Sequence, residues 1–339
     1  MRALNLINCR IVAYLLSSFS YTGLKKVQNW PITLEIVFIE SRLSSMKRIL
    51  FLLYIACLAN VSHGLVFQAE VEQTEWRLSP SIFECEFTQP IPNYGEAVFY
   101  HEAGEDLLFH LRTKKNLMGE GMAALHIEPP EWLPSQMAQD LGLVDVKNSS
   151  KPIRVDHDRA NKMMQSLMQG LRPTFTRRAR YDPSQSIRVA VSPARFNSFY
   201  NDYLGCVAGL LPVNFGQVSR SKVFFPGGGA ALDKQARKKL DLIALYVKAD
   251  PEVQAIYIDG HSDALGRRYN NRRLSEDRAL KVNEYLIERG LDAEIITTRY
   301  HGERYPVASN ATAAGRAQNR RVTIRLEKPD EELETSLDY

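Results

Sequence analysis

The strongest constraint on the fold is the order of segments between residues 255 and 289. Residues 255–258, which are apolar or amphipathic, predict a strand that leads into the turn Asp259-Gly-His-Ser-Asp263, and a helical pattern covers residues 274–289. Asp263 at the strand end and Arg278 on the following helix can therefore face one pocket. Such a pocket suits a zwitterionic ligand, because a carboxylate binds an ammonium and a planar guanidinium fork binds a carboxylate.

The segment after residue 213 predicts the order β-α-β-α-β-β. Strands are expected at residues 222–225, 255–259, 295–300 and 321–327, and helices at residues 233–248 and 274–289. Apolar side chains recur on one face of each helix: Leu240, Ile243, Ala244, Val247, then Ala279, Val282 and Leu286. Ser275 is a candidate N-cap of the second helix, and Gly290 follows its end. In the last strand we expect Val322 to point inward and Arg321 outward.

Residues 65–213 have a different pattern. Short stretches alternate apolar and polar residues, which predicts a mostly antiparallel β domain with one solvated face: residues 97–101, 107–112, 123–127 and 187–191. Helices are expected at residues 158–170 and at about 193–211. Residues 213–221 form a candidate junction. The predicted fold class is thus α+β, with domains at residues 65–213 and 214–328 and an acidic tail at 329–339.

Residues 46–64 resemble a secretory signal, and residues 1–45 look like no domain. Met46-Lys47-Arg48 precedes the short apolar run 49–59, and small residues allow cleavage after Gly64. Residues 46–64 are therefore predicted to be a signal peptide, and residues 1–45 an upstream extension that arises from a translation start placed too early. The alternative is a genuine extension with an internal anchor. Lipidation of Cys57 is disfavoured because Tyr54 occupies the −3 position.

Two cysteines, Cys85 and Cys206, remain after such a cleavage. An even pair in an exported protein predicts a disulfide, and two free thiols are the alternative. The bond would close a loop of about 120 residues and contribute about 4–5 kcal/mol in the chain-entropy model. No cysteine or histidine spacing matches a metal site, so no metal is expected.

Other common functions find little support in the sequence. A net charge of +4 is mild, and no nucleic-acid-binding module is present. The glycines at 227–229 lack the context of a phosphate-binding loop. His261, Ser262 and Asp263 are contiguous, whereas a triad places its base between the other two groups. We therefore expect neither an enzyme nor a cofactor.

The second domain resembles the OmpA C-terminal family, which binds peptidoglycan. The resemblance covers about residues 218–327 and rests on Gly260-His-Ser-Asp263, Gly266, Asn271, Leu274-Ser275, Arg278-Ala279, Gly290, Gly302-Glu303, Pro306 and Asn319-Arg320-Arg321-Val322. It implies that Asp263 binds the ammonium and Arg278 the carboxylate of meso-diaminopimelate in the stem peptide. The other implied site residues are Ser262, Asn271, Leu274, Asn319 and Arg320. Ser262 stands where threonine is more usual, and the glycines at 227–229 replace a more polar segment.

The first domain resembles the MotY family of sodium-driven flagellar motors. The resemblance rests on Trp76, Cys85-Glu-Phe, residues 89–99, Met118-Gly119, residues 129–132, Arg172-Pro-Thr-Phe175 and residues 196–206. It implies a periplasmic T-ring component and a Cys85–Cys206 disulfide. The implied partners are peptidoglycan, a MotX-like protein, the flagellar basal body and a PomA/PomB-type stator complex.

Two alternatives to a motor role remain open. One is a general OmpA-like tether between the cell envelope and peptidoglycan. The other is a wall-processing enzyme that uses this domain for targeting. The enzyme would need a catalytic constellation within residues 65–213, and the sequence there provides none.

Overall fold

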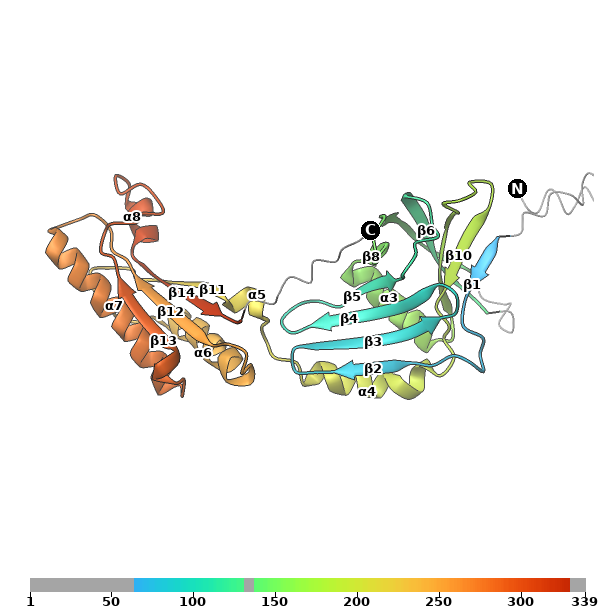
Figure 1. Ribbon diagram of the computed structural model, residues 1–339, viewed down its shortest axis with the longest axis horizontal. Coiled ribbons are helices and arrows are strands. Elements are labelled where there is room, and N and C mark those ends of the chain that lie inside the picture. The colour runs from blue at the N-terminus through green and yellow to red at the C-terminus, as the bar shows by residue number, and fades with distance from the viewer. Residues whose placement is uncertain (1–63, 131–136, 330–339) are drawn as a thin grey trace, which may run out of the picture. The chain divides into compact units, whose positions relative to one another are not determined.

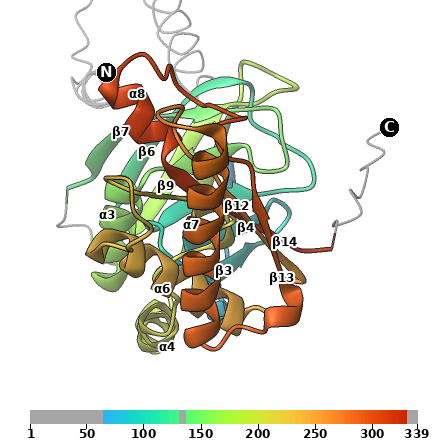
Figure 2. The same cartoon turned by 90° about the vertical axis from the view of Figure 1, so that its left-hand side faces the viewer.

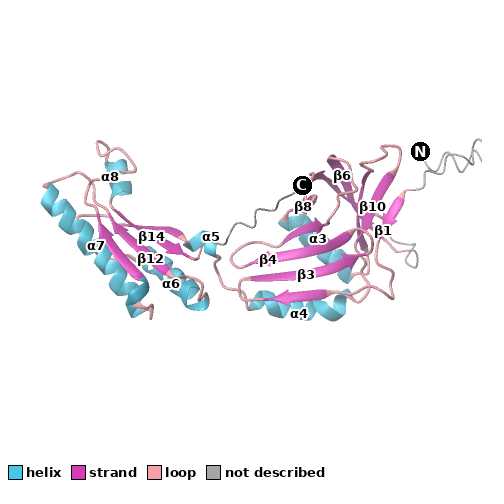
Figure 3. Ribbon diagram, in the orientation of Figure 1, coloured by secondary structure: helices cyan, strands magenta, loops and turns pink. Residues whose placement is uncertain are grey.

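The computed structural model describes residues 64–130 and 137–329 (Figure 1). The predicted upstream extension, the signal peptide up to residue 63 and the tail from residue 330 lie outside these residues, so they stay predictions. No helix in the described ranges is both long and apolar enough to cross a membrane. The fold class is α+β, as the sequence predicts, with strands and helices in both halves (Figure 3).

The first half contains a ten-stranded sheet in the order β1-β10-β9-β6-β7-β8-β5-β4-β3-β2. Neighbouring strands from β2 to β5 pair antiparallel, as do β5 with β8 and β6 with β7 and β9. The strands are β1 Leu65–Phe67, β2 Arg77–Pro80, β3 Glu84–Ile91, β4 Gly95–Glu102, β5 Leu108–Arg112, β6 Gly121–Glu128, β7 Gln139–Val146, β8 Ile153–Val155, β9 Arg172–Arg178 and β10 Ser186–Ala190. The predicted antiparallel β domain is therefore confirmed.

An aromatic cluster forms the centre of the core on one face of this sheet. The Trp76 ring lies 4.6 Å from Phe87 and 5.0 Å from Phe196, measured between centroids. Alternate residues of β3 and β4 point into the same core, which explains the period-two pattern of the sequence. Burial of aromatic side chains removes large apolar areas from water and so provides much of the stability.

Two helices carry further core residues of this half. Helix α3 His157–Met168 begins with Asp156 as its N-cap and buries Ala160, Met163, Met164 and Leu167. Helix α4 Phe196–Ala208 is three residues shorter at each end than predicted. Arg195, just before it, adopts a left-handed conformation with φ of 58°, and Gly209 is its C-cap. The aromatic stripe of α4 is only partly in the core, since Phe196 and Tyr203 are buried and the two aromatics between them half-buried.

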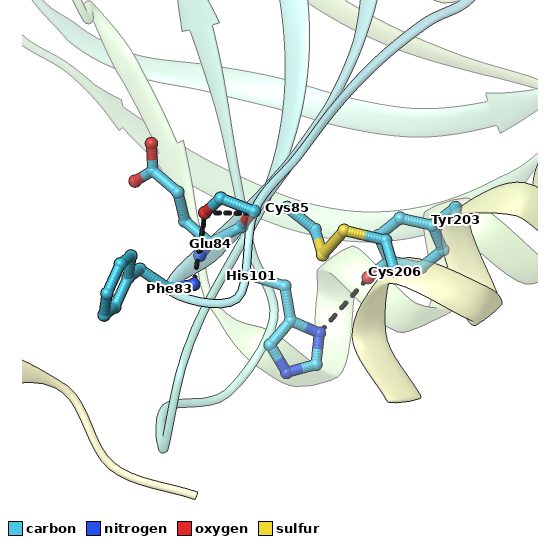
Figure 4. Close-up of a disulfide and its surroundings, with 7 residues drawn as sticks. Phe83, Glu84, Cys85, His101, Tyr203 and Cys206 are labelled. Carbon is cyan, nitrogen blue, oxygen red and sulfur yellow. Dashed lines mark hydrogen bonds between the residues drawn. A yellow bond between two sulfur atoms is a disulfide. The ribbon is translucent and has the colours of Figure 1, made fainter. Parts of the chain in front are cut away.

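The predicted disulfide joins β3 to α4 (Figure 4). The Cα atoms of Cys85 and Cys206 are 6.2 Å apart across 121 residues of sequence. One helical turn away, the Tyr203 hydroxyl lies 3.3 Å from Nδ1 of His101, which sits opposite Cys85 on β4. The bond therefore fixes α4 on the sheet at a site that packing already orders.

We expect loss of this bond to destabilise the first domain. Replacing both cysteines by serine frees a loop of 121 residues in the unfolded chain, which corresponds to about 5 kcal/mol in the chain-entropy model. The measurement is urea unfolding, with and without reductant, of a chain that begins at residue 64. Reductant should lower the urea midpoint of the wild type and leave that of the double variant unchanged. Wild-type midpoints that are equal with and without reductant would contradict the prediction.

The second half has a four-stranded sheet in the order β11-β14-β12-β13. Its strands are β11 Arg220–Phe224, β12 Ala255–Gly260, β13 Ile296–Tyr300 and β14 Arg321–Glu327, of which only β12 and β13 pair in parallel. Helices α6 Lys234–Ala249 and α7 Arg268–Glu288 bury their predicted apolar faces, and α7 runs along the sheet (Figure 2). The predicted order β-α-β-α-β-β is confirmed.

Three features of this half differ from the predictions. Helix α7 begins at Arg268, six residues early, so Ser275 is not its N-cap but a fully buried residue at the start of its third turn. The short helices α5 Phe215–Val218 and α8 Ala313–Asn319 and the 3₁₀ turn η1 Ala293–Ile295 were not expected, because they are too short to show periodicity. Arg321 was expected on the outer face in solvent, yet it is only 4% exposed.

Candidate ligand-binding site

Two glycines allow α7 to pack against the end of β12, where the candidate site lies. A Cβ on Gly260 would lie 2.0 Å from the Ser275 carbonyl oxygen, so only glycine fits there. Gly302 adopts a left-handed φ of 59°; its N–H donates to Ser275 Oγ and its carbonyl accepts from Ser262 N–H. These bonds fix the turn that carries Ser262 and Asp263.

Arg278 is completely buried at the centre of the site. Its guanidinium donates to three backbone carbonyls: Nε to Gly229 at 3.0 Å, Nη1 to His261 at 3.2 Å and Nη2 to Gly227 at 2.7 Å. We call these three oxygens the carbonyl cradle. The guanidinium carbon also lies 5.1 Å from the Phe225 ring centroid, at cation–π distance.

The carbonyl cradle leaves part of the guanidinium free. Arginine has five N–H groups, and three are used within the described chain, so one remains on each Nη nitrogen. Two N–H groups on adjacent nitrogens match the two oxygens of a carboxylate. Burial lowers the pKa of Arg278 to about 10, with Asp263 acting in the opposite direction, so the group stays cationic at neutral pH.

Asp263 forms an ion pair with Arg320. Its Oδ2 lies 3.0 Å from Arg320 Nη1, and its Oδ1 accepts from Leu265 N–H at 3.2 Å. In the described part of the chain Asp263 and Arg278 form no ion pair with each other. Arg320 also donates to the carbonyls of Phe225 and Pro226, at 3.0 and 3.2 Å. Arg320 thus joins Asp263 to the loop that supplies two oxygens of the carbonyl cradle.

The charges of this cluster favour a ligand with a free carboxylate. Arg278 and Arg320 bring two positive charges and Asp263 one negative charge, which leaves a net charge of +1. A zwitterionic group could place its ammonium on Asp263, which is 9% exposed; its carboxylate would reach Arg278, which is 0% exposed, after neighbouring residues move. The ammonium would then share Asp263 with Arg320.

The other predicted site residues lie around this cluster in different roles. Ser262 is buried and its Oγ donates to the Asp263 carbonyl at 3.0 Å, while Leu274 is half-buried on α7. Asn271 is buried and its amide donates to the Glu303 carboxylate. Asn319 accepts from Val307 and Ala308 N–H and donates to the Ala308 carbonyl and Asn310 Oδ1.

Asn319 therefore orders the loop of the site but has no free hydrogen-bonding group for a ligand. An amide side chain has two donors and two acceptor positions, and all four are used in the loop at residues 307–310. Sequence reasoning missed the carbonyl cradle, because backbone oxygens leave no residue-type signal. Glu303 belongs to the Gly302-Glu303 motif of the sequence, although nothing there indicates Asn271 as its partner.

A histidine stack lies next to the turn. The rings of His261 and His301 are 5.1 Å apart, and Nε2 of His301 lies 2.9 Å from Asp259 Oδ1. Burial, followed by the nearby charge of Arg321, lowers the pKa of His261 to about 4. His261 also supplies one carbonyl of the cradle.

We expect the C-terminal domain to lose stability between pH 6.5 and 4. The unfolded chain protonates His261 near pH 6.5 and the folded chain only near pH 4, so the unfolded state binds more protons in this window. Thermal melts at several pH values should show a smaller acid-induced decrease in Tm for His261→Gln than for wild type. His126→Gln, on β6, is the control, and equal decreases in all three proteins would contradict the assignment.

Comparison with known families agrees with the two halves of the fold. Residues 67–212 match the MotY N-terminal domain, and residues 224–320 match the OmpA family. The chain therefore contains a MotY N-terminal domain followed by an OmpA-family domain. In residues 64–130 and 137–329, no three or more His, Cys, Asp or Glu side chains are placed to hold a metal ion.

Three individual proteins illustrate these similarities. The sodium-type flagellar protein MotY of Vibrio parahaemolyticus is 29% identical over 266 residues, which are 78% of this chain and 90% of the relative. The peptidoglycan-binding protein ArfA of Mycobacterium bovis is 38% identical over 107 residues, 32% of each chain. The C-terminal domain of Helicobacter pylori MotB aligns with 32% of this chain and 86% of its own, at 22% identity and a TM-score of 0.31.

Proposed function

We propose that this chain, which joins a MotY N-terminal domain to an OmpA-family domain, is a periplasmic peptidoglycan-binding component of a flagellar motor. The C-terminal domain binds the meso-diaminopimelate residue of the stem peptide and has no catalytic role. Asp263 binds the ammonium of that residue and Arg278 its carboxylate. The N-terminal domain docks on the basal body and on a MotX-like partner in the T ring, so that stator units are anchored around the rotor.

The observation that carries this proposal is the buried guanidinium of Arg278 with two N–H groups to spare. A buried arginine without a carboxylate partner is costly, because desolvation of the charge is only partly offset by neutral carbonyls. A ligand carboxylate supplies the missing counter-charge. Diaminopimelate has a carboxylate and an ammonium on one carbon, which matches Arg278 beside Asp263.

The motor role is supported by the N-terminal half. The match to the MotY N-terminal domain covers residues 67–212, and the similarity to a sodium-type flagellar protein extends over both halves of the chain. A protein that holds the wall with one domain and a ring component with the other gives a stator a fixed point to push against. Docking through the N-terminal domain leaves the C-terminal site free for peptidoglycan.

We expect Asp263→Asn and Arg278→Ala to weaken binding to isolated sacculi by roughly 10–100-fold. A hydrogen-bonded charge typically contributes about 1.5–3 kcal/mol, and each substitution removes one. Co-sedimentation of the mature protein with sacculi measures the loss. Arg278→Ala leaves three carbonyls without a donor and could lower the stability of the domain. Asp263→Asn keeps the side-chain shape and the acceptor for Leu265 N–H, so it tests the charge alone.

A matched control for these variants exists on the helical face. Asp241 and Arg289 form an exposed ion pair at 2.6 Å, so Asp241→Asn and Arg289→Ala remove the same charges away from the site. Both controls should bind sacculi like wild type. Undiminished binding by Asp263→Asn and by a folded Arg278→Ala would refute the site.

A swimming assay distinguishes a role in the motor from a role as a general envelope tether. A deletion strain that expresses Asp263→Asn should spread poorly in soft agar, although wild-type protein restores spreading and the envelope stays intact. The reason is that an unanchored stator cannot deliver torque. Normal spreading together with detergent sensitivity would favour the tether instead.

A further inference from the structure

Helices α6 and α7 border a groove that the proposed function does not use. Its volume is about 640 Å³, and it is lined by four cationic side chains, Lys234, Arg237, Lys238 and Arg289, and by one carboxylate, Asp241. None of these residues belongs to the candidate site. We call this feature the α6–α7 groove.

The carboxylate of the α6–α7 groove is already bound to one of its four cations. Asp241 Oδ1 accepts from Arg289 Nε at 2.6 Å and from the Tyr285 hydroxyl at 2.9 Å. The guanidinium carbon of Arg289 also lies 4.5 Å from the centroid of the Tyr285 ring. Asp241 and Arg289 therefore compensate each other and leave the charges of the remaining three cations unbalanced.

The three remaining cations lie close together on α6 and are exposed to solvent. Arg237 donates only from Nε, to the Leu232 carbonyl at 3.2 Å. Lys234 and Lys238 have neither an ion pair nor a hydrogen bond within residues 64–130 and 137–329, and both are exposed. Side chains three and four residues apart share one face of a helix, so these three positive charges point into the same region.

The open face of the sheet is also basic, but its arginines have partners. Arg299 pairs with Asp259 at 2.8 Å, and Arg325 pairs with Glu327 at 3.0 Å. Both guanidinium carbons lie against the ring of Tyr257, at 5.0 and 4.7 Å from its centroid. The α6–α7 groove, rather than the sheet, thus has uncompensated charge to offer an anionic ligand.

The chain contains an acidic segment that matches this charge. Residues 330–339 include five Asp or Glu side chains and no Lys or Arg. Blocks of like charge of this kind are often interaction segments. Lys328, just before the segment, has its Nζ 2.6 Å from Oδ2 of Asp250, the C-cap of α6. The acidic segment therefore starts beside the end of the helix that carries the three free cations.

The acidic segment is long enough to reach the groove. At 1.5 Å per residue, α6 rises about 18 Å from Asp250 back to Lys238 and about 24 Å to Lys234. Ten extended residues span up to about 33 Å. Leu245 and Lys248, both exposed, lie on the same stripe of the helix and offer an apolar and a cationic contact along that path.

We infer that the α6–α7 groove is a binding site for an acidic peptide segment, and that residues 330–339 of the same chain occupy it. Carboxylates of the segment pair with Lys234, Arg237 and Lys238. Each exposed ion pair contributes little, so binding depends on several pairs acting together and weakens with salt. A bound segment keeps other polyanions out of the groove. The inference goes beyond the proposed function, because the groove shares no residue with the peptidoglycan site.

A labelled synthetic peptide of residues 330–339 tests the groove by fluorescence anisotropy. Its partner is a chain of residues 64–329, whose two buried cores include no residue of the segment. We expect the double variant Lys234→Glu, Lys238→Glu to bind the peptide at least tenfold more weakly than wild type. Both positions are exposed, so neither core loses packing.

The matched control makes the same charge change on the open face of the sheet. Arg220 and Lys222 are exposed on β11, and the double variant Arg220→Glu, Lys222→Glu should bind the peptide within threefold of wild type. The titrations are made in about 0.1 M salt, where the screening length of about 10 Å limits the effect of charges far from the peptide.

Occupancy by the chain's own segment is tested with a chain of residues 64–339. A tethered segment has an effective concentration in the millimolar range, so it competes with added peptide. We expect this chain to bind the peptide at least tenfold more weakly than the chain of residues 64–329. Replacing the five acidic residues of the tethered segment by Asn or Gln should restore the affinity.

Four results would overturn the inference. The first is a chain of residues 64–329 that does not bind the peptide, and the second is a groove variant that binds it as well as wild type. The third is equal affinity of the two chains for the peptide. The fourth is binding of phosphatidylglycerol vesicles to the chain of residues 64–339 through Lys234 and Lys238, unchanged when the segment is neutralised, which would assign the groove to a membrane.

Discussion

The candidate site depends on one buried cation, the guanidinium of Arg278. It connects the end of β12, through the His261 carbonyl, with the loop after β11, through Gly227 and Gly229. Removing a charge from water is expensive, and neutral carbonyls recover only part of that free energy. A carboxylate bound at the two remaining N–H groups would complete the compensation, so in the proposed function the residue that organises the loops would also bind the ligand.

The ion pair between Asp263 and Arg320 determines where the negative group of the candidate site lies. Arg320 holds Asp263 and the carbonyls of Phe225 and Pro226 together, which places the negative group next to the loop of the carbonyl cradle. In the proposed function, an incoming ammonium would share this carboxylate with Arg320. Binding of the ammonium and of the carboxylate would then be coupled through one loop, and a ligand with only one of the two groups would bind more weakly.

Much of this arrangement follows from the sequence, and the rest does not for identifiable reasons. Period-two and period-3.6 patterns locate most strands and helices because one face of each is buried. Asp263 and Arg278 could be placed in one site because only the short segment at residues 261–267 joins β12 to α7. Their actual partners could not be predicted, since backbone carbonyls have no sequence signature and Arg320 is distant in the chain. The expected cap at Ser275 was wrong because residues 268–273 are helical without an apolar face.

Binding of diaminopimelate by the C-terminal domain is the central claim, and a comparison of two stem peptides tests it most directly. Titration calorimetry would compare the mature chain's affinity for a stem peptide with diaminopimelate and for the same peptide with lysine. Lysine lacks the second carboxylate, so it leaves Arg278 without its counter-charge. We expect the lysine peptide to bind at least tenfold more weakly, and equal affinity for the two peptides would contradict the assignment of Arg278 as the carboxylate-binding residue.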